Sequence, residues 1–356
     1  MNLVVLGLSI TSSWGNGHAT NYRALVRALA ERGHDVLFLE RDAPWYAANR
    51  DLPEPPWGGT ELYASQAELR ERWGEAVAAA DAVVLGSYVP EGVAVAEWVL
   101  ATARGSVAFW DIDTPVTVTK LDDGDEEYLS RALVPRFDLY LSFTGGPLLA
   151  RIERDYGARR AVPFYCIADP ELYRPLEADE RWLIGYLGTY SADRQPAVES
   201  LLLEPARRLP EARFAVAGPQ YPASLRWPAN VERVEHVPPG RHAAFYARQR
   251  FTLNVTRAAM VRAGWSPSVR LFEAAACATP VISDRWSGLD EFFRPGTEIF
   301  IVDAPGEVVE VLCDVSPDEA RAVGEAARAR VLAEHTPARR AQELEHLLRT
   351  VVQVAA

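Results

Sequence analysis

Short apolar runs alternate with segments of helical periodicity along most of this sequence, and this alternation restricts the fold more than any other feature. Residues 3–10 form an apolar run that ends in a polar loop, 11–17. Apolar residues from Tyr22 to Leu29 then recur at i, i+3, i+4 and i+7, the spacing of one helix face. Gly33 follows as the expected C-terminal stop. Alternation of this kind favours parallel sheets with crossover helices, so the predicted fold class is α/β.

The alternation forms two series, and a chain of 356 residues exceeds one ordinary α/β core. We therefore predict one Rossmann-like domain over 1–167, a linker over 168–180 and a second Rossmann-like domain over 181–336. From Pro337 onward, residues 337–356 are predicted to form a helix that crosses back to the first domain. The expected strands are 3–10, 35–40, 82–86, 107–111, 139–143 and 161–166 in the first domain, and 182–187, 213–217, 251–255, 280–283 and 299–302 in the second. Expected helices include 66–80, 93–103 and 147–156.

Charge and composition exclude several classes of function. The formal net charge is −12 and no basic patch is visible, which argues against nucleic acid as a partner. Lys120 is the only lysine, so a phosphate clamp must use arginine, backbone N–H groups or helix ends. Lys120 also lies in the wrong half of the chain to be the Schiff-base lysine of a pyridoxal-phosphate phosphorylase.

The location of the protein is predicted from what the sequence lacks. The first ten residues have no basic region or cleavage site, so they predict a strand and not a signal peptide. No apolar stretch approaches 18 residues, so we expect no transmembrane segment. Cys166, Cys277 and Cys313 have no metal-binding or redox spacing, which fits a cytoplasmic protein.

The most informative motif covers residues 266–282. A strand leads into a helix that carries Ser268, Arg270 and Glu273 in its first turns and ends before the next buried strand. A helix N-terminus with a serine and an arginine suits a diphosphate, and a carboxylate just inside suits the two hydroxyls of a ribose. The alternative is a capped helix in which Glu273 only interacts with the positive end of the helix dipole.

A glycine-containing loop joins the first predicted strand to the first helix. It holds Trp14, Gly15, Asn16 and Gly17, followed by His18. Such a loop lets the backbone approach a ligand at the helix N-terminus, so Trp14, Asn16 and Gly17 are predicted to bind an acceptor. His18 is a candidate general base. A tight structural turn with His18 as a helix cap is the alternative.

Two aspartates, Asp111 and Asp113, follow the predicted strand 107–111 at D-x-D spacing. This spacing can chelate a divalent metal that bridges a nucleotide diphosphate. The two-domain organisation instead predicts no metal, with Asp111 binding the acceptor and Asp113 serving as a second candidate catalytic residue. A turn cap by Asp113 is an alternative of similar weight. Aromatic residues within 44–57, a proline-rich segment, suggest a lid or stacking wall for a ring-bearing acceptor.

Residues 271–282 resemble the glutamate-bearing helix of family 4 GT-B glycosyltransferases (glycosyl transferases group 1), and are more similar to the CgeB-like branch. Residues 288–293, Pro295 and Gly296 extend the resemblance. Other landmarks follow in the same order: Asp169, Pro170, Tyr173 and Pro175; the glycine turn at 185–188; and the strand end at 216–219. The resemblance covers residues 165–335 well and the N-terminal half in outline.

The resemblance implies two Rossmann-like domains facing across a cleft, the GT-B architecture, in which the second domain binds a UDP- or GDP-linked sugar. By position, Glu273 would bind the ribose, and Gly188 with Arg194 would lie near the diphosphate. The family has a second glutamate eight residues earlier, where this chain has Trp265, so no stereochemical course is predicted.

The predicted function is metal-independent transfer of a hexosyl group from a nucleotide-sugar to a small-molecule or glycan acceptor, without a cofactor. Two alternatives stay open at this stage. One is a nucleotide-sugar epimerase or hydrolase on the same fold, and the other is a non-catalytic sugar-nucleotide binding protein.

Overall fold

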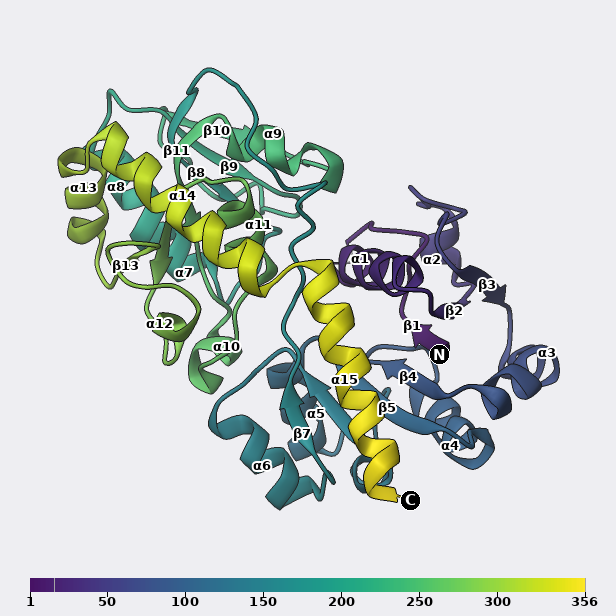
Figure 1. Cartoon of the computed structure of the whole chain (residues 1–356). Coiled ribbons are helices and arrows are strands. Elements are labelled where there is room, and N and C mark those ends of the chain that lie inside the picture. The colour runs from purple at the N-terminus through teal and green to yellow at the C-terminus, as the bar shows by residue number, and fades with distance from the viewer. Residues whose placement is uncertain (16, 356) are drawn as a thin grey trace. The chain divides into compact units, whose positions relative to one another are not determined.

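A computed structural model describes residues 1–15 and 17–355 and divides the chain into two compact units (Figure 1). Unit 1 comprises Met1–Ile167 together with the C-terminal segment from Pro337, and unit 2 comprises Ala168–Thr336. The segment 168–180, expected as a linker, is thus part of unit 2.

Unit 1 is built on a seven-stranded parallel sheet with the order β3-β2-β1-β4-β5-β6-β7. Its central strands are buried on both faces, as parallel sheets covered by crossover helices require. The strand order changes direction at β1 and β4, which pair directly with each other. The strands are β1 Asn2–Gly7, β2 Asp35–Arg41, β3 Gly59–Tyr63, β4 Ala82–Gly86, β5 Ser106–Asp111, β6 Leu139–Ser142 and β7 Ala161–Pro163.

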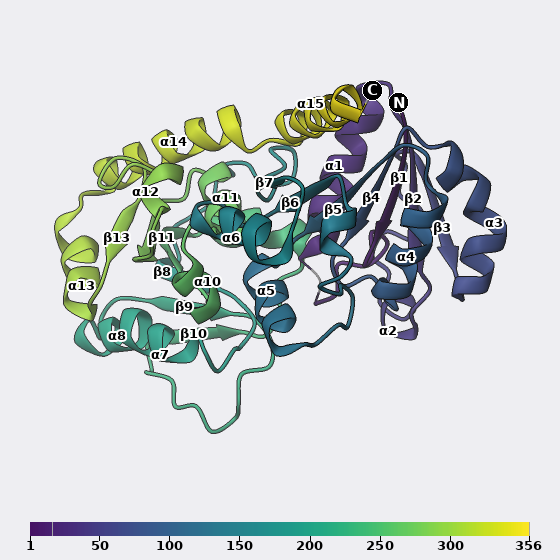
Figure 2. The same cartoon turned by 90° about the horizontal axis from the view of Figure 1, so that it is seen from below.

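The helices of unit 1 connect these strands, and the last helix of the chain joins them. Helix α15 packs against α1 (Figures 1 and 2). An ion pair joins Arg32, the C-cap residue of α1, to Glu345 near the middle of α15. The helices are α1 His18–Glu31, α2 Pro44–Ala47, α3 Gln66–Ala79, α4 Gly92–Thr102, α5 Thr114–Asp123, α6 Pro147–Tyr156 and α15 Pro337–Ala355, with a short turn η1 at Val134–Arg136.

Unit 2 repeats the architecture with a six-stranded parallel sheet of order β10-β9-β8-β11-β12-β13. Here the strand order reverses between β8 and β11. The strands are β8 Trp182–Leu187, β9 Phe214–Ala217, β10 Val231–Val234, β11 Gln249–Asn254, β12 Val281–Asp284 and β13 Phe300–Val302.

The helices of unit 2 cover this sheet, and the long α14 packs against α11 (Figure 1). Helix α14 starts with a capping box in which Ser316 and Glu319 satisfy each other's backbone N–H groups. The helices are α7 Gln195–Val198, η2 Glu199–Leu203, α8 Glu204–Arg208, η3 Pro239–Arg241, α9 His242–Tyr246, α10 Ala258–Ala263, α11 Val269–Ala276, α12 Leu289–Phe292, α13 Pro305–Asp314 and α14 Pro317–Glu334.

The α/β fold class predicted from the sequence is confirmed by these two sheets. Two strands, β3 and β10, were not predicted. Both lie at an edge of their sheet and most of their residues are only partly buried, so they lack the continuous apolar run that marks a central strand. Helix α5 was also missed, and it begins directly after Asp113.

Candidate functional site

Unit 2 carries a polar cluster where its strand order reverses. Gly188 follows β8 and Asn254 ends β11, and these two strands are neighbours. In open α/β sheets, ligands bind outside the carboxyl ends of the strands at such a reversal. The predicted residues Gly188, Ser268 and Arg270 are brought together here.

Arg270 is a buried cation at the centre of this cluster, with 8% of its surface exposed. Its Nε donates to the backbone oxygen of Leu187, and a terminal nitrogen donates to Oδ1 of Asn254 at 3.1 Å. The guanidinium also lies 4.9 Å from the ring centre of Tyr186. These partners are neutral, and no carboxylate in the described part of the chain forms an ion pair with Arg270. A buried charge held in this way is ready to receive an anion.

Arg194 adds a second positive charge. It occupies the N-cap position of α7, and a terminal nitrogen donates to the backbone oxygen of Thr189 at 2.7 Å. Burial, together with the nearby charges of Arg270 and Arg257, lowers the pKa of Arg194. Positive charges are thus held close together at the edge of the sheet. Binding of a polyanion such as a diphosphate would reduce the repulsion between them.

Gly188 is a glycine for a steric reason. A Cβ atom at this position would lie 2.6 Å from the hydroxyl of Tyr186 and 2.8 Å from a terminal nitrogen of Arg270. A Cβ on Gly218 would in turn lie 2.0 Å from the backbone oxygen of Gly188. The two turns after β8 and β9 therefore pack backbone against backbone beside the arginine.

Asn254 orients two of the predicted residues and was missed by the sequence analysis. Its Oδ1 accepts from Ser268 Oγ at 2.8 Å as well as from Arg270. Its Nδ2 donates to Ser283 Oγ at 2.9 Å, which fixes the orientation of the amide. The available signal was an asparagine at the end of an otherwise apolar strand. Ser268 is the N-cap residue of α11, but its side chain makes no cap hydrogen bond.

Glu273 is buried in α11 beside residues from two other segments. Its Oε2 lies 3.4 Å from Nδ1 of His242, the first residue of α9. Burial alone would raise the pKa of Glu273, but His242, Tyr173 and Arg270 together lower it below its ordinary value. Glu273 therefore stays ionised near neutral pH and can accept hydrogen bonds. The role of His242 here had no signal in the sequence.

Trp265, at the position where the resemblance would place a further glutamate, has a left-handed backbone with φ of 45°. Its backbone N–H donates to the oxygen of Ser287, and Nε1 donates to Glu291, both at 2.7 Å. A Cβ on Gly288 would lie 2.5 Å from the indole ring. This strained conformation for a bulky residue is thus held by contacts on two sides.

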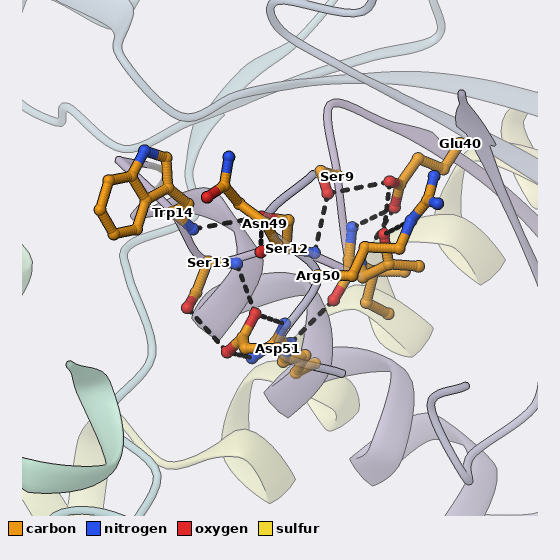
Figure 3. A network of polar contacts seen from close by, with 11 residues as sticks. Ser9, Ser12, Ser13, Trp14, Glu40, Asn49, Arg50 and Asp51 are labelled. Atoms are coloured by element: carbon orange, nitrogen blue, oxygen red, sulfur yellow. Dashed lines mark hydrogen bonds and ion pairs between the residues drawn. The ribbon is translucent and has the colours of Figure 1, made fainter. Parts of the chain in front are cut away.

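In unit 1, one buried carboxylate, Glu40, binds the start of the loop between β1 and α1 (Figure 3). Glu40, at the end of β2, is fully buried and accepts four hydrogen bonds of 2.7 to 3.0 Å from Ser9, Ile10 and Thr11. A buried charge is tolerated when it is hydrogen-bonded this fully. The start of the loop is therefore rigid.

A second carboxylate, Asp51, fastens the next part of the loop (Figure 3). It accepts hydrogen bonds from the backbone N–H and the hydroxyl of Ser13 and forms a bidentate ion pair with Arg23. Burial opposes ionisation, yet Arg23 and Ser13 hold the pKa of Asp51 well below its usual range. Ser12 Oγ also donates to the backbone oxygen of Asn49 at 2.7 Å.

The tip of this loop is open to solvent. Trp14 is 45% exposed, and its backbone N–H donates to Ser12 Oγ at 3.3 Å. Gly17 is exposed and precedes α1 as its N-cap residue. Asn16, the remaining predicted residue of the loop, lies outside the described residues. Trp45, on α2 in the proline-rich segment, is 63% exposed.

His18 begins α1 and lies beside a tyrosine from the neighbouring strand end. Its ring centre is 5.4 Å from that of Tyr88, which follows β4, in an edge-to-face arrangement. Burial lowers the pKa of His18 to about 4. The imidazole is therefore neutral at pH 7 and able to accept a proton.

Asp111 and Asp113 have different surroundings, although the D-x-D spacing suggested a shared role. Asp111 is fully buried, and its oxygens accept from Thr117 at 2.7 Å and from Tyr140. Burial raises its pKa to about 6. Both oxygens of Asp111 are thus engaged inside the unit, and its contact with an acceptor stays a prediction.

Asp113 is only partly buried and occupies the N-cap position of α5, but its side chain makes no cap hydrogen bond. Instead, its Oδ2 accepts from the Tyr88 hydroxyl at 3.2 Å. Tyr88 has a φ of 62°, a conformation that is costly for a bulky residue and often occurs at functional sites. His18 and Asp113 thus both contact Tyr88, where the strand order of unit 1 reverses.

Within residues 1–15 and 17–355, no three or more His, Cys, Asp or Glu side chains gather as a metal site would require. No helix among the described residues has the length and apolar character needed to cross a membrane.

Comparisons with known proteins agree with this architecture. A family model described as glycosyl transferase-like matches residues 194–346. No curated protein matches the sequence significantly.

Solved structures match both units. The sucrose-phosphate synthase of Thermosynechococcus elongatus matches with a TM-score of 0.70 at 17% identity, over 99% of each chain. Anabaena HepE, in complex with UDP and glucose, matches with a TM-score of 0.72 at 14% identity, over 98% of this chain and 100% of that one. An alpha-glucosyltransferase in complex with UDP matches with a TM-score of 0.69 at 11% identity, over 98% and 99%.

These findings bear out the prediction of a glycosyltransferase, whereas the CgeB-like branch stays a prediction. The chain has the two-domain GT-B fold of glycosyltransferases, and its residues 194–346 carry the sequence pattern of the glycosyl transferase-like family.

Proposed function

We propose that this protein transfers a hexosyl group from a UDP-linked sugar, bound by unit 2, to a hydroxyl of a small-molecule or glycan acceptor, bound by unit 1. UDP is preferred to GDP as the donor nucleotide because HepE and the alpha-glucosyltransferase were solved with UDP.

The observation that carries the proposal is the buried guanidinium of Arg270, whose hydrogen bonds go to neutral acceptors. Arg194 brings a second positive charge nearby. Together they would bind the diphosphate and stabilise the negative charge that develops on it as the bond to the sugar breaks. Because two arginines supply the counter-charge, we propose that transfer does not depend on a metal ion.

The remaining predicted residues of unit 2 would bind other parts of the donor. Ser268, at the N-terminus of α11, lies beside Arg270 through their shared partner Asn254. The turn at Gly188 would let the donor approach the backbone. Glu273, kept ionised by its neighbours, would accept hydrogen bonds from the ribose.

On the acceptor side, His18 and Asp113 are the proposed catalytic residues. The acceptor oxygen attacks the anomeric carbon, the bond from that carbon to the diphosphate oxygen breaks, and the acceptor proton passes to one of these two residues. Trp14 and Gly17, at the tip of the loop that Glu40 and Asp51 hold, would contact the acceptor.

Ligand-dependent thermal unfolding tests the donor. We expect UDP and UDP-glucose to stabilise the protein, by about 2.7 kcal/mol at a hundred times the dissociation constant. GDP and GDP-mannose serve as controls, and stabilisation by neither pair would refute the proposal. Transfer is then sought by incubating UDP-glucose with a panel of glycosides, with and without EDTA. Loss of transfer in EDTA and recovery with Mn²⁺ would refute metal independence. Release of free glucose without transfer would instead favour a hydrolase.

A further inference from the structure

Asn21 is a fully buried amide in the first turn of α1. The other buried residues of this helix are alanine, leucine, valine and tyrosine. A buried amide costs free energy unless its polar atoms find partners. Here Oδ1 accepts from the backbone N–H of Ile167 at 2.8 Å, and Nδ2 donates to the backbone oxygen of Gly17 at 3.1 Å. Asn21 therefore joins two segments that are far apart in the chain.

The two partners of Asn21 are the end of one segment and the beginning of another. Ile167 is buried and is the last residue of the first stretch of unit 1. Gly17 ends the loop between β1 and α1, and its peptide bond leads directly into His18. Thr20 also donates to the Gly17 oxygen at 3.1 Å. That bond is exposed and stays within the same turn, so it connects the loop to no other segment.

The two ends of this loop are held differently. Two carboxylates bind its start, between residues 9 and 13. A Cβ atom added to Gly15 or Gly17 would meet no described atom within 4 Å, so neither glycine packs closely against another segment. Glycine also leaves its own backbone less restricted than any other residue does. The hydrogen bond from Asn21 therefore limits the movement of the end of the loop that carries His18.

We propose that Asn21 is a positioning residue for the transfer reaction, which fixes the peptide between Gly17 and His18 and through it the imidazole of His18. The inference rests on the proposed function, in which His18 is a candidate general base, and it names a residue on which this base depends. A general base must lie within hydrogen-bond reach of the proton that it accepts, so a small displacement of the imidazole lowers the rate. Because Asn21 is fully buried, it acts on the reaction only through His18.

The alternative is that Asn21 serves stability alone, by satisfying the buried backbone N–H of Ile167. Substitution can separate the two hydrogen bonds. A serine inside a helix donates to the backbone oxygen four residues earlier, which here is that of Gly17. Serine is also one atom shorter than asparagine, so we expect Asn21→Ser to keep the bond to Gly17 and to lose the bond to Ile167.

Transfer kinetics on the full-length protein, with UDP-glucose as the donor, test the proposal. Asn21→Leu keeps the approximate volume of the side chain but neither hydrogen bond, so we expect kcat to fall at least about tenfold while the affinity for UDP stays unchanged. Asn21→Ala removes the same two bonds without adding an apolar group of that size, and should show the same change. Asn21→Ser should recover most of the lost turnover.

The matched control is Asn230→Leu in unit 2. Nδ2 of Asn230 donates to three backbone oxygens at 2.9 to 3.0 Å. The residue directly precedes β10, so it lies away from the carboxyl ends of the strands. Its substitution should lower the unfolding temperature and leave kcat unchanged.

NMR of the protein labelled in its histidines gives a readout that does not depend on activity. Burial lowers the pKa of His18 to about 4. Comparison with His18→Gln assigns its resonances. Without the hydrogen bond from Asn21 the imidazole should become more exposed to water, so in Asn21→Leu and Asn21→Ala its pKa should rise toward the ordinary value of 6.5. In Asn21→Ser and Asn230→Leu, His18 should titrate as in the wild type.

The outcomes separate this inference from the proposed function. If the wild type transfers no sugar, the proposed function fails, and the role of Asn21 in transfer fails with it. If the wild type transfers sugar but Asn21→Leu and Asn21→Ala keep full turnover and an unchanged His18 titration, the inference is overturned while the proposed function stands. Equal losses of kcat in Asn21→Leu, Asn21→Ser and Asn230→Leu would also overturn it, because the losses would then follow stability alone.

Discussion

The hydroxyl of Tyr88 donates a hydrogen bond to Oδ2 of Asp113, across the carboxyl ends of two neighbouring strands of unit 1. The same ring meets His18 edge to face. The left-handed backbone of Tyr88 is costly for this residue type, so the surrounding structure must compensate for it. Tyr88 thereby connects the two proposed catalytic residues.

Tyr88→Phe tests this connection, because it removes the hydroxyl and keeps the ring. We expect kcat/KM for the acceptor to fall about tenfold, the effect of one hydrogen bond to a charged group, with the affinity for UDP unchanged. Kinetics of transfer from UDP-glucose to the acceptor found by screening would measure it. In an Asp113→Asn background the substitution should have no further effect.

The matched control is Tyr156→Phe. Tyr156 also donates to an aspartate of unit 1, Asp122, but the pair lies at the C-terminal ends of α6 and α5, away from the carboxyl ends of the strands. Its loss should leave the kinetics unchanged. Equal effects of the two substitutions would show that Tyr88 contributes only to the stability of unit 1.

Arg270→Lys tests the proposed diphosphate site while keeping the positive charge. Lysine cannot bond to Leu187 and Asn254 at once in the geometry of the guanidinium, so we expect UDP to bind at least about tenfold more weakly. Calorimetry would measure the change. Arg285→Lys, at an exposed ion pair with Asp303, should bind UDP like the wild type. Unchanged affinity in a folded Arg270→Lys protein would refute the diphosphate assignment.

Asp111 predicts a pH dependence of stability. Its folded-state pKa of about 6 lies above the ordinary value of 3.8, so the folded state holds the proton more tightly. The resulting stabilisation is fully present below pH 3.8 and is lost as the pH rises through 6, by up to about 3 kcal/mol. Denaturant unfolding of the wild type and Asp111→Asn, compared between pH 4 and 7, would measure it. A pH-independent difference between the two proteins would contradict the prediction.

The sequence was sufficient to predict the α/β class and the central strands, because continuous apolar runs such as those of β4 and β5 are buried on both faces and leave a clear pattern. The edge strands β3 and β10 were not predicted because partial exposure of their residues interrupts the apolar run. Helix α5 was not predicted because its first six residues are threonine, proline and valine, which have a low intrinsic helix propensity.

The site could be predicted only in part from the sequence. Arg270 and Ser268 stand out because they open a helix after a buried strand. Tyr88 and His242 did not stand out, because their roles depend on contacts between segments far apart in the chain, Tyr88 with Asp113 and His242 with Glu273. Asp111 could not be separated from Asp113 by spacing, since only burial distinguishes them.

His18 is the proposed general base with the more direct chemical argument. Burial lowers its pKa to about 4, from the ordinary value of 6.5. The imidazole is therefore unprotonated throughout the neutral range and has a nitrogen to accept the acceptor proton, and acidification toward pH 4 is needed to protonate it. The same lowered pKa makes His18 a weaker base than an ordinary histidine. The alternative is that His18 serves only the start of α1, where its loss would lower stability without affecting the chemistry.

His18→Ala separates these roles. Loss of a general base typically costs between 10² and 10⁴ in rate, so we expect kcat to fall at least about a hundredfold with little change in the affinity for UDP. Transfer kinetics and calorimetry would measure the two quantities, and His346→Ala, at an exposed position on α15, is the control. If His18→Ala keeps nearly full turnover, either Asp113 accepts the proton or the reaction uses no base from the protein. Asp113→Asn would then decide between these two, because only the first predicts a comparable loss of kcat.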